Sequence, residues 1–518
     1  MILDAAIIVT YFVVIFAIGV RARLRGSVSV DEYFLGSRSL RWPQIAVSTI
    51  ATNVHAGHFL GAAGSAYLYG LAQANLEINA IFGILLAAFL FVPMYLRLRV
   101  TTITQFFESR FGPRVALYYS VLMIALYGFM YLGSALFWAS YAVNGAFGEL
   151  IAFLGDDPQT RLRTLALLLG AFSATYTLLG GLRAVVRTDM VQFALLVTGG
   201  VVLLVTAVQH LGGWSQLYGK TGHLMHLHMP SDHPKLPWTA ILGMLLLNLN
   251  YWGSNQIILQ RALAARDLRE AQIGLLVGGV LKYATALLVV VPGIALAGIL
   301  AERPLADPDR AYLTLVTEFL PVGARGLVLC GLFASLMSTV DSIFNSVATL
   351  WSVDIYRRYL RPHATEAEVV RAGKGAILVA LGTGLAFAFL QIHVKFTDPG
   401  FALTHWFNET TYYMKNGFVL LIMCAVFLAG PSRKLVGTGL AASIALTFAM
   451  KAAFPDVNYF VRTSVVVLTT FALVALPTMA RCGWRVPLGE MGGTAGPGMK
   501  RAGVALLASL ILLHTLLH

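Results

Sequence analysis

The chain has 518 residues, of which 58% are hydrophobic and only 12% are charged. A soluble protein carries roughly twice that share of charged residues. The formal net charge of +13 would favour nucleic acid as the partner of a soluble protein. Here the arginines and lysines instead gather in short loops between apolar runs, a pattern that orients membrane helices. Composition therefore argues against nucleic-acid binding and indicates an all-α integral membrane protein.

Apolar runs long enough to cross a bilayer as helices recur along the whole chain. The first run is preceded by Asp4 and followed by Arg21, Arg23 and Arg25, which predicts a retained span with its N-terminus outside rather than a cleaved signal. Loops that this topology places in the cytoplasm are richer in arginine and lysine than the others. We expect a multi-pass protein of the cell membrane, with both termini outside and about fourteen spans, at residues 3–20, 42–66, 71–96, 115–143, 164–181, 186–208, 237–262, 273–300, 323–353, 375–394, 405–429, 436–454, 461–479 and 502–517.

Two of these spans carry polar interruptions, at residues 51–58 of the second and 250–256 of the seventh. Interrupted helices in corresponding places of two halves are typical of a transporter whose binding site lies at the middle of the membrane. If the first span is peripheral, the next ten form two five-helix units in a LeuT-type inverted repeat. The expected division is a peripheral N-terminal helix and cytoplasmic loop (1–40), a first repeat (41–210), an extracellular loop (211–236), a second repeat (237–430) and peripheral C-terminal helices (431–518).

The ninth span carries hydroxyl and amide side chains within one narrow sector of a helix, with Asp341 at the edge of that sector. A hard monovalent cation binds several neutral oxygens and often no more than one negative charge. Small polar residues also mediate packing between membrane helices. Together with the broken second span, however, the sector favours a cation site. Its members are Ser335, Ser338, Thr339, Ser342, Asn345, Ser346 and Thr349.

Several sequence blocks together resemble the solute:sodium symporter family, and within it the sodium–glucose cotransporters. The resemblance covers roughly residues 1–430, and its blocks lie at residues 31–42, 51–54, 58–61, 176–189, 251–265 and 338–356. It implies that sodium is the coupling ion. It places the sodium ligands on the backbone carbonyls of Ala51, Val54 and Ser335 and on the hydroxyls of Ser338 and Thr339.

The same resemblance implies where a sugar would bind. Polar contacts would come from Asn53, His58, Glu77, Asn248 and Lys282, while Tyr251 would cover the sugar and Trp252 follows it. A contact from the tenth helix of the core falls on Asn408.

The charges at these positions agree with an uncharged solute. Glu77 accepts hydrogen bonds, Lys282 donates them, and the two neutralise each other when the site is empty. An anionic substrate would need positive charge that is not compensated. A sugar also needs paired donors and acceptors and an apolar cover for its ring face, which Tyr251 offers. We therefore predict a sodium-coupled symporter that imports a small neutral sugar or polyol by alternating access.

The chain departs from the sugar cotransporters in three places. Asn408 is followed by Glu409, Lys415 and Asn416 replace small residues and proline, and Asp341 replaces a small residue. The alternative functions are a sodium- or proton-coupled symporter for an amino or carboxylic acid, and a solute sensor that does not transport.

Asp341 also raises the possibility of a second cation position. Some family members bind a second sodium near the residues that match Asp189 and Ser342, and two neighbouring carboxylates share a proton or recruit a cation. We hypothesise a position formed by Asp189, Ser338, Asp341 and Ser342. In the alternative, Asp189 pairs with a cytoplasmic arginine such as Arg187 or Arg261, and Asp341 faces water.

A membrane-embedded enzyme or metal protein is the remaining class. His55 and His58 are spaced as two ligands on a helix, and four more histidines lie at 223, 226, 228 and 233. Spacing alone is a weak signal, because a catalytic zinc site needs a third ligand and an open position. We expect no enzyme, no nucleic-acid partner and no obligate protein partner; the expected partners are the solute, Na+ and the lipid bilayer.

Overall fold

Helices make up nearly all of the chain in the computed structural model, which describes residues 2–23, 28–54, 58–149, 151–398, 403–483 and 495–517. No β-strand occurs in these ranges, where two isolated bridges are the only β pairing. Eleven helices in the described chain are long and apolar enough to cross a membrane. An all-helical membrane protein was the prediction, and it is confirmed.

The elements of the first half begin with α1 (Ile2–Arg21) and end with the long helix α11 (Pro158–Leu211). Short 3-10 or π-helical turns join some of the helices between them, such as the turns at Gly70–Ala74 and Leu126–Tyr131. These helices are α2 (Val30–Leu35), α3 (Trp42–Asn53), α4 (Ala63–Tyr69), α5 (Asn75–Ile78), α6 (Ala80–Leu86), α7 (Val92–Arg97), α8 (Ile103–Phe111), α9 (Pro113–Ala125) and α10 (Leu132–Phe147).

The second half contains the longer uninterrupted helices. They follow α12 (Trp214–Thr221), which lies in the connection between the halves. The helices are α13 (Ile241–Gly253), α14 (Gln256–Leu263), α15 (Leu268–Ile299), α16 (Ala311–Thr314), α17 (Ala324–Thr349), α18 (Glu366–Thr397), α19 (Leu403–Phe427), α20 (Arg433–Ala453), α21 (Tyr459–Cys482) and α23 (Pro497–Leu516).

Two of the eleven apolar segments each hold two crossings. The backbone of α11 breaks at Gly181, with φ 52° and ψ −145°. A Cβ atom at Gly181 would lie 2.3 Å from the carbonyl oxygen of Tyr33, so glycine allows both the positive φ and the close approach. Phe59–Arg97 is divided in the same way at Gly70 (φ 62°). With the interrupted pair α13–α14 as a further crossing, the described residues contain the fourteen spans expected.

Both predicted helix interruptions are present. Helix α3 ends at Asn53, Val54 has an extended backbone, and the next described helical residue is His58. Helix α13 ends at Gly253 and α14 begins at Gln256. Asn255, the second of the two residues between them, caps α14 by accepting a 3.0 Å hydrogen bond from the Ile257 amide. Each interruption therefore leaves non-helical backbone inside the protein, where it is protected from lipid.

Buried tyrosines hold the α13–α14 interruption in place. Tyr95 donates a hydrogen bond to the carbonyl of Gly253, and Tyr119 donates one to the carbonyl of Ser254. Tyr127 donates to the Asn255 side chain at 2.7 Å. Backbone carbonyls freed by a broken helix are costly unless they find a donor, and these tyrosines provide donors from the first half of the chain.

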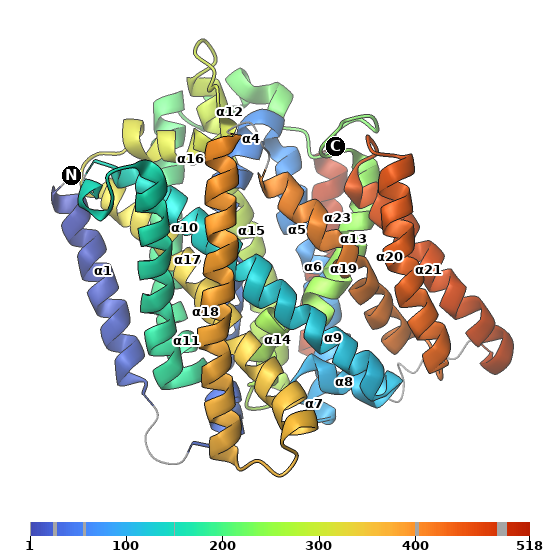
Figure 1. The fold of residues 1–518 in the computed structure, drawn as a ribbon. Coiled ribbons are helices and arrows are strands. Elements are labelled where there is room, and N and C mark those ends of the chain that lie inside the picture. Colours follow the sequence, from blue (N-terminus) through green and yellow to red (C-terminus); the bar gives the residue numbers. More distant parts are fainter. Residues whose placement is uncertain are drawn as a thin grey trace.

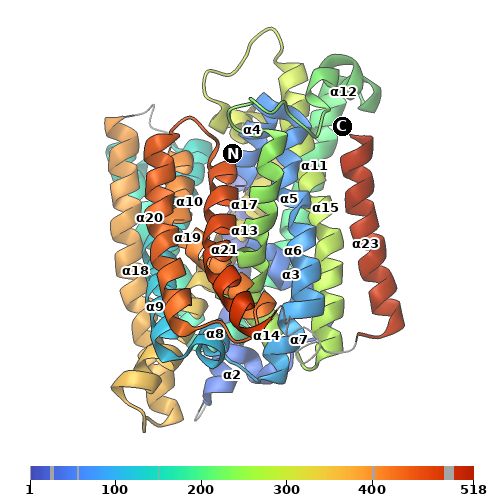
Figure 2. The ribbon, with the colours of Figure 1, turned by 90° about the vertical axis from the view of Figure 1, so that its right-hand side faces the viewer.

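Helix α17 lies at the centre of the molecule and the terminal helices lie at its edge. In the most apolar stretch of α17 and the π-helical turn that follows it, 89% of the residues are buried. In the corresponding stretches of α1, α20 and α23, the buried share is 28%, 22% and 17%. Figure 1 shows α1 and Figure 2 shows α23 on the outside of the bundle, and both figures show the two termini at one end of the molecule. The core helices therefore surround the ninth expected span.

Polar contacts join α19 to the two helices that follow it. The carboxylate of Glu409 on α19 lies 2.7 Å from the Lys451 ammonium of α20 and 2.6 Å from the Arg462 guanidinium of α21. About two turns further on, Asn416 donates to Thr447 of α20 and accepts from Thr463 of α21, both at 3.1 Å. The three helices are thus connected at two levels.

Candidate solute and cation sites

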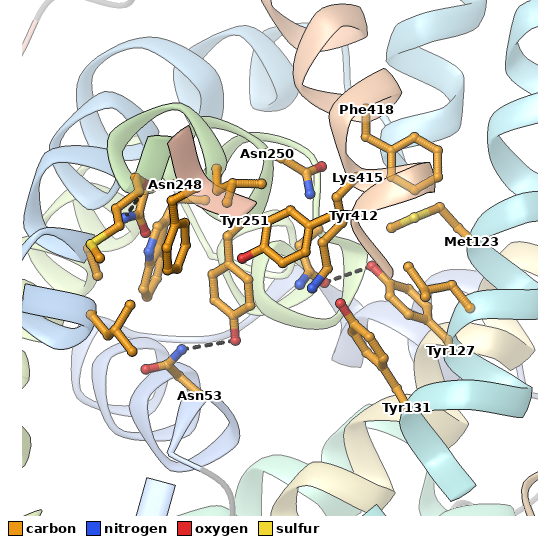
Figure 3. A pocket seen from close by; sticks show the side chains of 18 of the residues that line it. Asn53, Met123, Tyr127, Tyr131, Asn248, Asn250, Tyr251, Tyr412, Lys415 and Phe418 are labelled. Atoms are coloured by element: carbon orange, nitrogen blue, oxygen red, sulfur yellow. Dashed lines mark hydrogen bonds between the residues drawn. The ribbon is translucent and has the colours of Figure 1, made fainter. Parts of the chain in front are cut away.

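A cavity of about 240 Å³ lies beside the two interrupted helices. Its wall comes from α13, the ends of α3 and α9, the Leu126–Tyr131 turn, α15 and α19, with smaller contributions from α5, α6 and α21. The lining mixes asparagines and tyrosines with apolar side chains. Figure 3 shows Asn53 and Tyr251 on one side of the cavity and Tyr127 and Tyr131 on the other, with Tyr412 and Lys415 between them.

A chain of hydrogen bonds runs along the α3 side of the cavity. The Asn53 side-chain amide donates to the Tyr251 hydroxyl at 2.9 Å, and its oxygen accepts from the Lys282 ammonium at 2.6 Å. Lys282 also forms an ion pair with Glu77, and both side chains are almost completely buried. Four of the residues predicted to contact the solute are therefore in direct contact with one another, although they come from four helices.

The opposite side of the cavity is aromatic. Tyr127 and Tyr131 lie one turn apart and both line the cavity. The Lys415 ammonium lies over two tyrosine rings, 5.5 Å from the centre of Tyr131 and 5.1 Å from the centre of Tyr412. Ring faces and phenol groups of this kind can cover the C–H faces of a ring-shaped solute and bond its hydroxyls.

The remaining predicted solute residues differ in what the structure says of them. Asn248 and Trp252 both line the cavity. The Asn248 amide donates to the Met244 carbonyl of its own helix at 2.9 Å, and the Trp252 Nε1 has no hydrogen-bond partner among the described residues. The side chains of His58 and Asn408 lie outside the described residues.

The predicted sodium ligands lie where α17 meets the end of α3. The Ser335 hydroxyl is 2.6 Å from the Val54 carbonyl oxygen. The Thr339 hydroxyl is 3.5 Å from the Thr52 carbonyl and 3.0 Å from the Ser335 carbonyl. Ala51 is buried two residues before the end of α3. Neutral oxygens from a broken helix and its neighbour therefore come together, as a sodium ion requires.

Ser338 faces a neighbouring cluster instead. Its hydroxyl donates to the Asp189 carboxylate at 2.6 Å and lies 3.3 Å from the Thr52 hydroxyl. Ser48 donates to the same carboxylate. The chain of hydroxyls continues from Thr52 to Ser342 at 3.0 Å. All these side chains are buried, so Asp189 lies at the centre of a buried group of hydroxyls.

The guanidinium of Arg261 enters this cluster. It lies 3.4 Å from Asp189, donates to Thr52 at 2.9 Å and to Ser48 at 3.0 Å, and also donates to Ser342. The alternative pairing of Asp189 with Arg261 is thus present in the structure. A second cation position stays a prediction, and in this conformation the oxygens that would form it are bound to a guanidinium.

Asp341 is separate from this cluster and has its own partners. Ser173 and Tyr176 of α11 both donate to its carboxylate. The side chain is fully buried, so the alternative in which it faces water is wrong. The hydroxyls replace water, which is why a carboxylate can lie at this depth.

Sequence reasoning did not assign site roles to Thr52, Tyr127, Tyr131 and Lys415. Thr52 stands between two predicted ligands, Ala51 and Val54, and its polarity in an apolar span was the available signal. Lys415 was noted only as a departure from the sugar cotransporters. The tyrosines carried no signal, because tyrosine is common in membrane helices.

The histidines do not form a metal centre in the described part of the chain, where no group of three or more histidine, cysteine, aspartate or glutamate side chains could hold a metal ion. His228 lies 2.9 Å from His514 of α23, and the His233 ring accepts from the Leu236 amide at 3.0 Å. His55 lies outside the described residues.

Two interrupted helices around a buried polar cavity define a secondary transporter. The model of the sodium:solute symporter family matches residues 33–433, and the chain belongs to this family. It is 32% identical to the sodium/glucose cotransporter of Vibrio parahaemolyticus over 82% of this chain and 85% of that protein. It is 31% identical to sodium/glucose cotransporter 1 of Ovis aries, over 82% of this chain and 68% of that protein.

Solved structures agree on the fold. A substrate-bound, outward-open Na+-coupled sialic acid symporter superposes with a TM-score of 0.78 at 19% identity, over 93% of this chain and 99% of that chain. The nucleobase-cation-symport-1 family transporter Mhp1 superposes with a TM-score of 0.52 at 15% identity, over the same shares. The LeuT-type architecture expected from the sequence is therefore present. The chain is a sodium-coupled solute symporter of a membrane and not an enzyme.

Proposed function

We propose that this symporter imports a polyhydroxylated solute, a sugar or a polyol, and that the solute binds in the cavity beside Asn53, Tyr251 and Lys282. The observation that carries the proposal is the continuous hydrogen-bonded chain from Tyr251 through Asn53 and Lys282 to Glu77. A solute with neighbouring hydroxyls can join such a chain, because each hydroxyl both donates and accepts.

The rest of the cavity supports the same class of solute. The amides of Asn248, Asn250 and Asn255 line the wall contributed by α13 and the two residues that follow it. Trp252 Nε1, which has no partner among the described residues, offers one more donor. Tyrosine rings cover the other side. Many weak polar contacts and a few ring faces suit a sugar better than an apolar amino acid, whose side chain makes no hydrogen bonds to the amides and phenols that line the cavity.

Coupling between solute and sodium follows from the end of α3, where neighbouring residues face the two sites. Asn53 faces the solute cavity, whereas its neighbours Thr52 and Val54 present carbonyls to Thr339 and Ser335. We propose that sodium binds at Ala51, Val54, Ser335, Ser338 and Thr339. An ion that fixes the end of α3 also fixes Asn53, so each ligand favours the helix conformation that binds the other, which is a reciprocal coupling.

The expected orientation places both termini outside the cell membrane. The two ends of the chain lie at the same end of the molecule, as an even number of spans requires (Figures 1 and 2). The arginine-rich loops at the opposite end support a cytoplasmic location for that end.

Uptake into proteoliposomes tests the proposal. Purified protein is reconstituted, and uptake of radiolabelled sugars, polyols, amino acids and carboxylic acids is measured with and without an inward sodium gradient, at clamped pH. We expect sodium-dependent uptake of a polyhydroxylated solute. Uptake of amino acids alone would overturn the solute class. Solute binding without any uptake would make the protein a sensor, and uptake that ignores sodium but follows a proton gradient would overturn the coupling ion.

A further inference from the structure

The solute cavity carries a positive charge that its surroundings do not neutralise. Among the described residues that line it, only Lys282 and Lys415 are charged, and no aspartate or glutamate lines it. Lys282 is paired with Glu77. The charge of Lys415 is therefore not balanced by a carboxylate that lines the cavity, and Lys415 was not among the residues expected to contact the solute.

Lys415 has no carboxylate partner in the described part of the chain. Among the described residues, its ammonium lies over the ring faces of Tyr131 and Tyr412, at 5.5 Å and 5.1 Å from the ring centres. A lysine that packs on two aromatic faces is held in position, but its charge is not cancelled. Its ammonium is therefore fixed at the cavity wall with hydrogen-bond donors to spare.

Three acidic residues of the core helices, Glu409, Asp189 and Asp341, are engaged by other groups. Glu409, on the same helix as Lys415, binds Lys451 at 2.7 Å and Arg462 at 2.6 Å. Asp189 is paired with Arg261, and Asp341 accepts from two hydroxyls of α11. A sodium ion at the end of α3 would add a further positive charge next to the cavity. An anion in the cavity thus meets attraction from several groups and repulsion from none that lines it.

We infer that the solute carries a carboxylate, and that Lys415 binds this group while the Asn53–Lys282 side of the cavity binds the hydroxyls. The substrate class is then a sugar acid, meaning a sugar ring or chain with one carboxylate. This inference rests on the proposed function and refines it, since it replaces the neutral solute expected from the sequence. A charge-assisted hydrogen bond is about twice as strong as a neutral one, so Lys415 would select the acid over its neutral analogue.

Matched pairs of solutes distinguish a sugar acid from a neutral sugar as the substrate. D-glucose and D-glucuronate differ only in the group at C6, and D-galactose and D-galacturonate form a second pair. Each solute is tested for sodium-dependent uptake and for binding to wild-type protein, Lys415→Met, Lys415→Arg and Lys500→Met. The last variant removes an exposed lysine of α23, far from the cavity in sequence, and controls for loss of charge alone.

We expect the acidic member of a pair to bind more tightly than the neutral member. In Lys415→Met the apparent affinity for the acid should fall by about tenfold or more, because a hydrogen bond to a charged group is lost, while Lys415→Arg and Lys500→Met retain it. Sodium-induced thermal stabilisation of each variant shows that it is folded, so a loss of acid binding is not a loss of structure.

Other outcomes are decisive in different ways. Uptake of the neutral sugars alone would overturn the sugar-acid inference and leave the proposed function intact. Uptake of the acids that is equal in wild type and Lys415→Met would overturn the role of Lys415. Sodium-driven uptake of amino acids with no uptake of any sugar or sugar acid would overturn the proposed function, and the inference with it.

Discussion

The guanidinium of Arg261 lies 3.4 Å from the carboxylate of Asp189, and neither side chain is exposed. The two residues come from α14 and α11, one on each side of the division between the halves of the chain. Hydroxyls of Ser48, Thr52 and Ser342 complete the donors and acceptors around the guanidinium. A buried pair with this many hydrogen bonds keeps both charges in the protein interior.

Removing one charge of this pair should destabilise the protein strongly. Arg261→Gln or Asp189→Asn leaves the other charge buried and unpaired, at a cost of about 3–5 kcal/mol. The double variant Asp189→Asn/Arg261→Gln should recover a large part of that loss. Thermal unfolding of purified protein measures it. Arg303→Gln/Glu318→Gln, which removes an exposed pair, is the control and should change little. Equal stability of all four proteins would contradict the argument.

Sodium activation of uptake tests the second cation position. If sodium also binds at Asp189, Asp341 and Ser342, the Hill coefficient should approach two and fall to one in Asp341→Ala. If the Arg261 guanidinium stays in place throughout the cycle, the coefficient should be one in the parent protein and unchanged in Asp341→Asn. Both outcomes are read from the same titration of uptake against sodium concentration, at fixed pH.

The hydroxyls of α17 should control sodium affinity rather than folding. Ser338→Ala with Thr339→Ala removes both hydroxyls that the sequence predicts as sodium ligands. Ser335→Ala with Thr339→Val removes one of them, together with the Ser335 hydroxyl that donates to the Val54 carbonyl. We expect the sodium concentration for half-maximal uptake to rise about fivefold or more, because each double variant loses one or two contacts that contribute about 1 kcal/mol each. Ser443→Ala is the control, because that buried hydroxyl of α20 has no hydrogen-bond partner among the described residues. An unchanged sodium requirement in both double variants would rule out this site.

Glu77 and Lys282 should be needed for solute binding individually, and for stability as a pair. Lys282→Ala and Glu77→Ala each leave a buried charge unpaired, so both should nearly abolish binding and lower the unfolding temperature. The double variant Glu77→Gln/Lys282→Met should regain stability without regaining binding, because the Asn53 side chain loses its charged partner. Competition binding and thermal unfolding together separate the two effects. Binding in the double variant at wild-type affinity would contradict a role in solute contact.

Cysteine labelling can test the orientation without any mutation that affects the core. Cys330 and Cys424 are buried, whereas Cys482 is exposed at the end of α21. The expected topology places Cys482 on the cytoplasmic side. A maleimide that cannot cross membranes should therefore label inside-out vesicles and leave intact cells unlabelled, and Cys482→Ala should remove the signal. Labelling of intact cells would reverse the predicted orientation.

The interruptions were predictable from the sequence because polar, glycine-containing runs inside an apolar span conflict with both helix propensity and lipid. The neighbour that each hydroxyl of α17 contacts was not predictable from the sequence. Ser335, Ser338 and Thr339 fall in one helical sector, yet Ser335 and Thr339 contact the end of α3 while Ser338 contacts Asp189. Helical periodicity shows which residues share a face, but the neighbour that each one meets depends on how the helices pack.

Lys415 shows the same limit for charge. The sequence places a lysine in an apolar span, which is a signal for function. Whether that lysine is neutralised depends on Glu409, which lies on the same helix and could have been its partner. In the structure, Glu409 instead forms ion pairs with Lys451 and Arg462, two residues of later helices. The charge balance of the cavity therefore follows from tertiary contacts that span more than forty residues.

The links from α19 to α20 and α21 have a mechanical consequence. Because Glu409 and Asn416 tie α19 to both neighbours at two heights, a tilt of α19 displaces the three helices together as one body. Lys415 and Tyr412 stand on the cavity side of that body. A solute bound to these two side chains therefore acts on a rigid unit of three helices. The resistance of the surrounding lipid to the movement of this unit would contribute to the rate of each opening and closing.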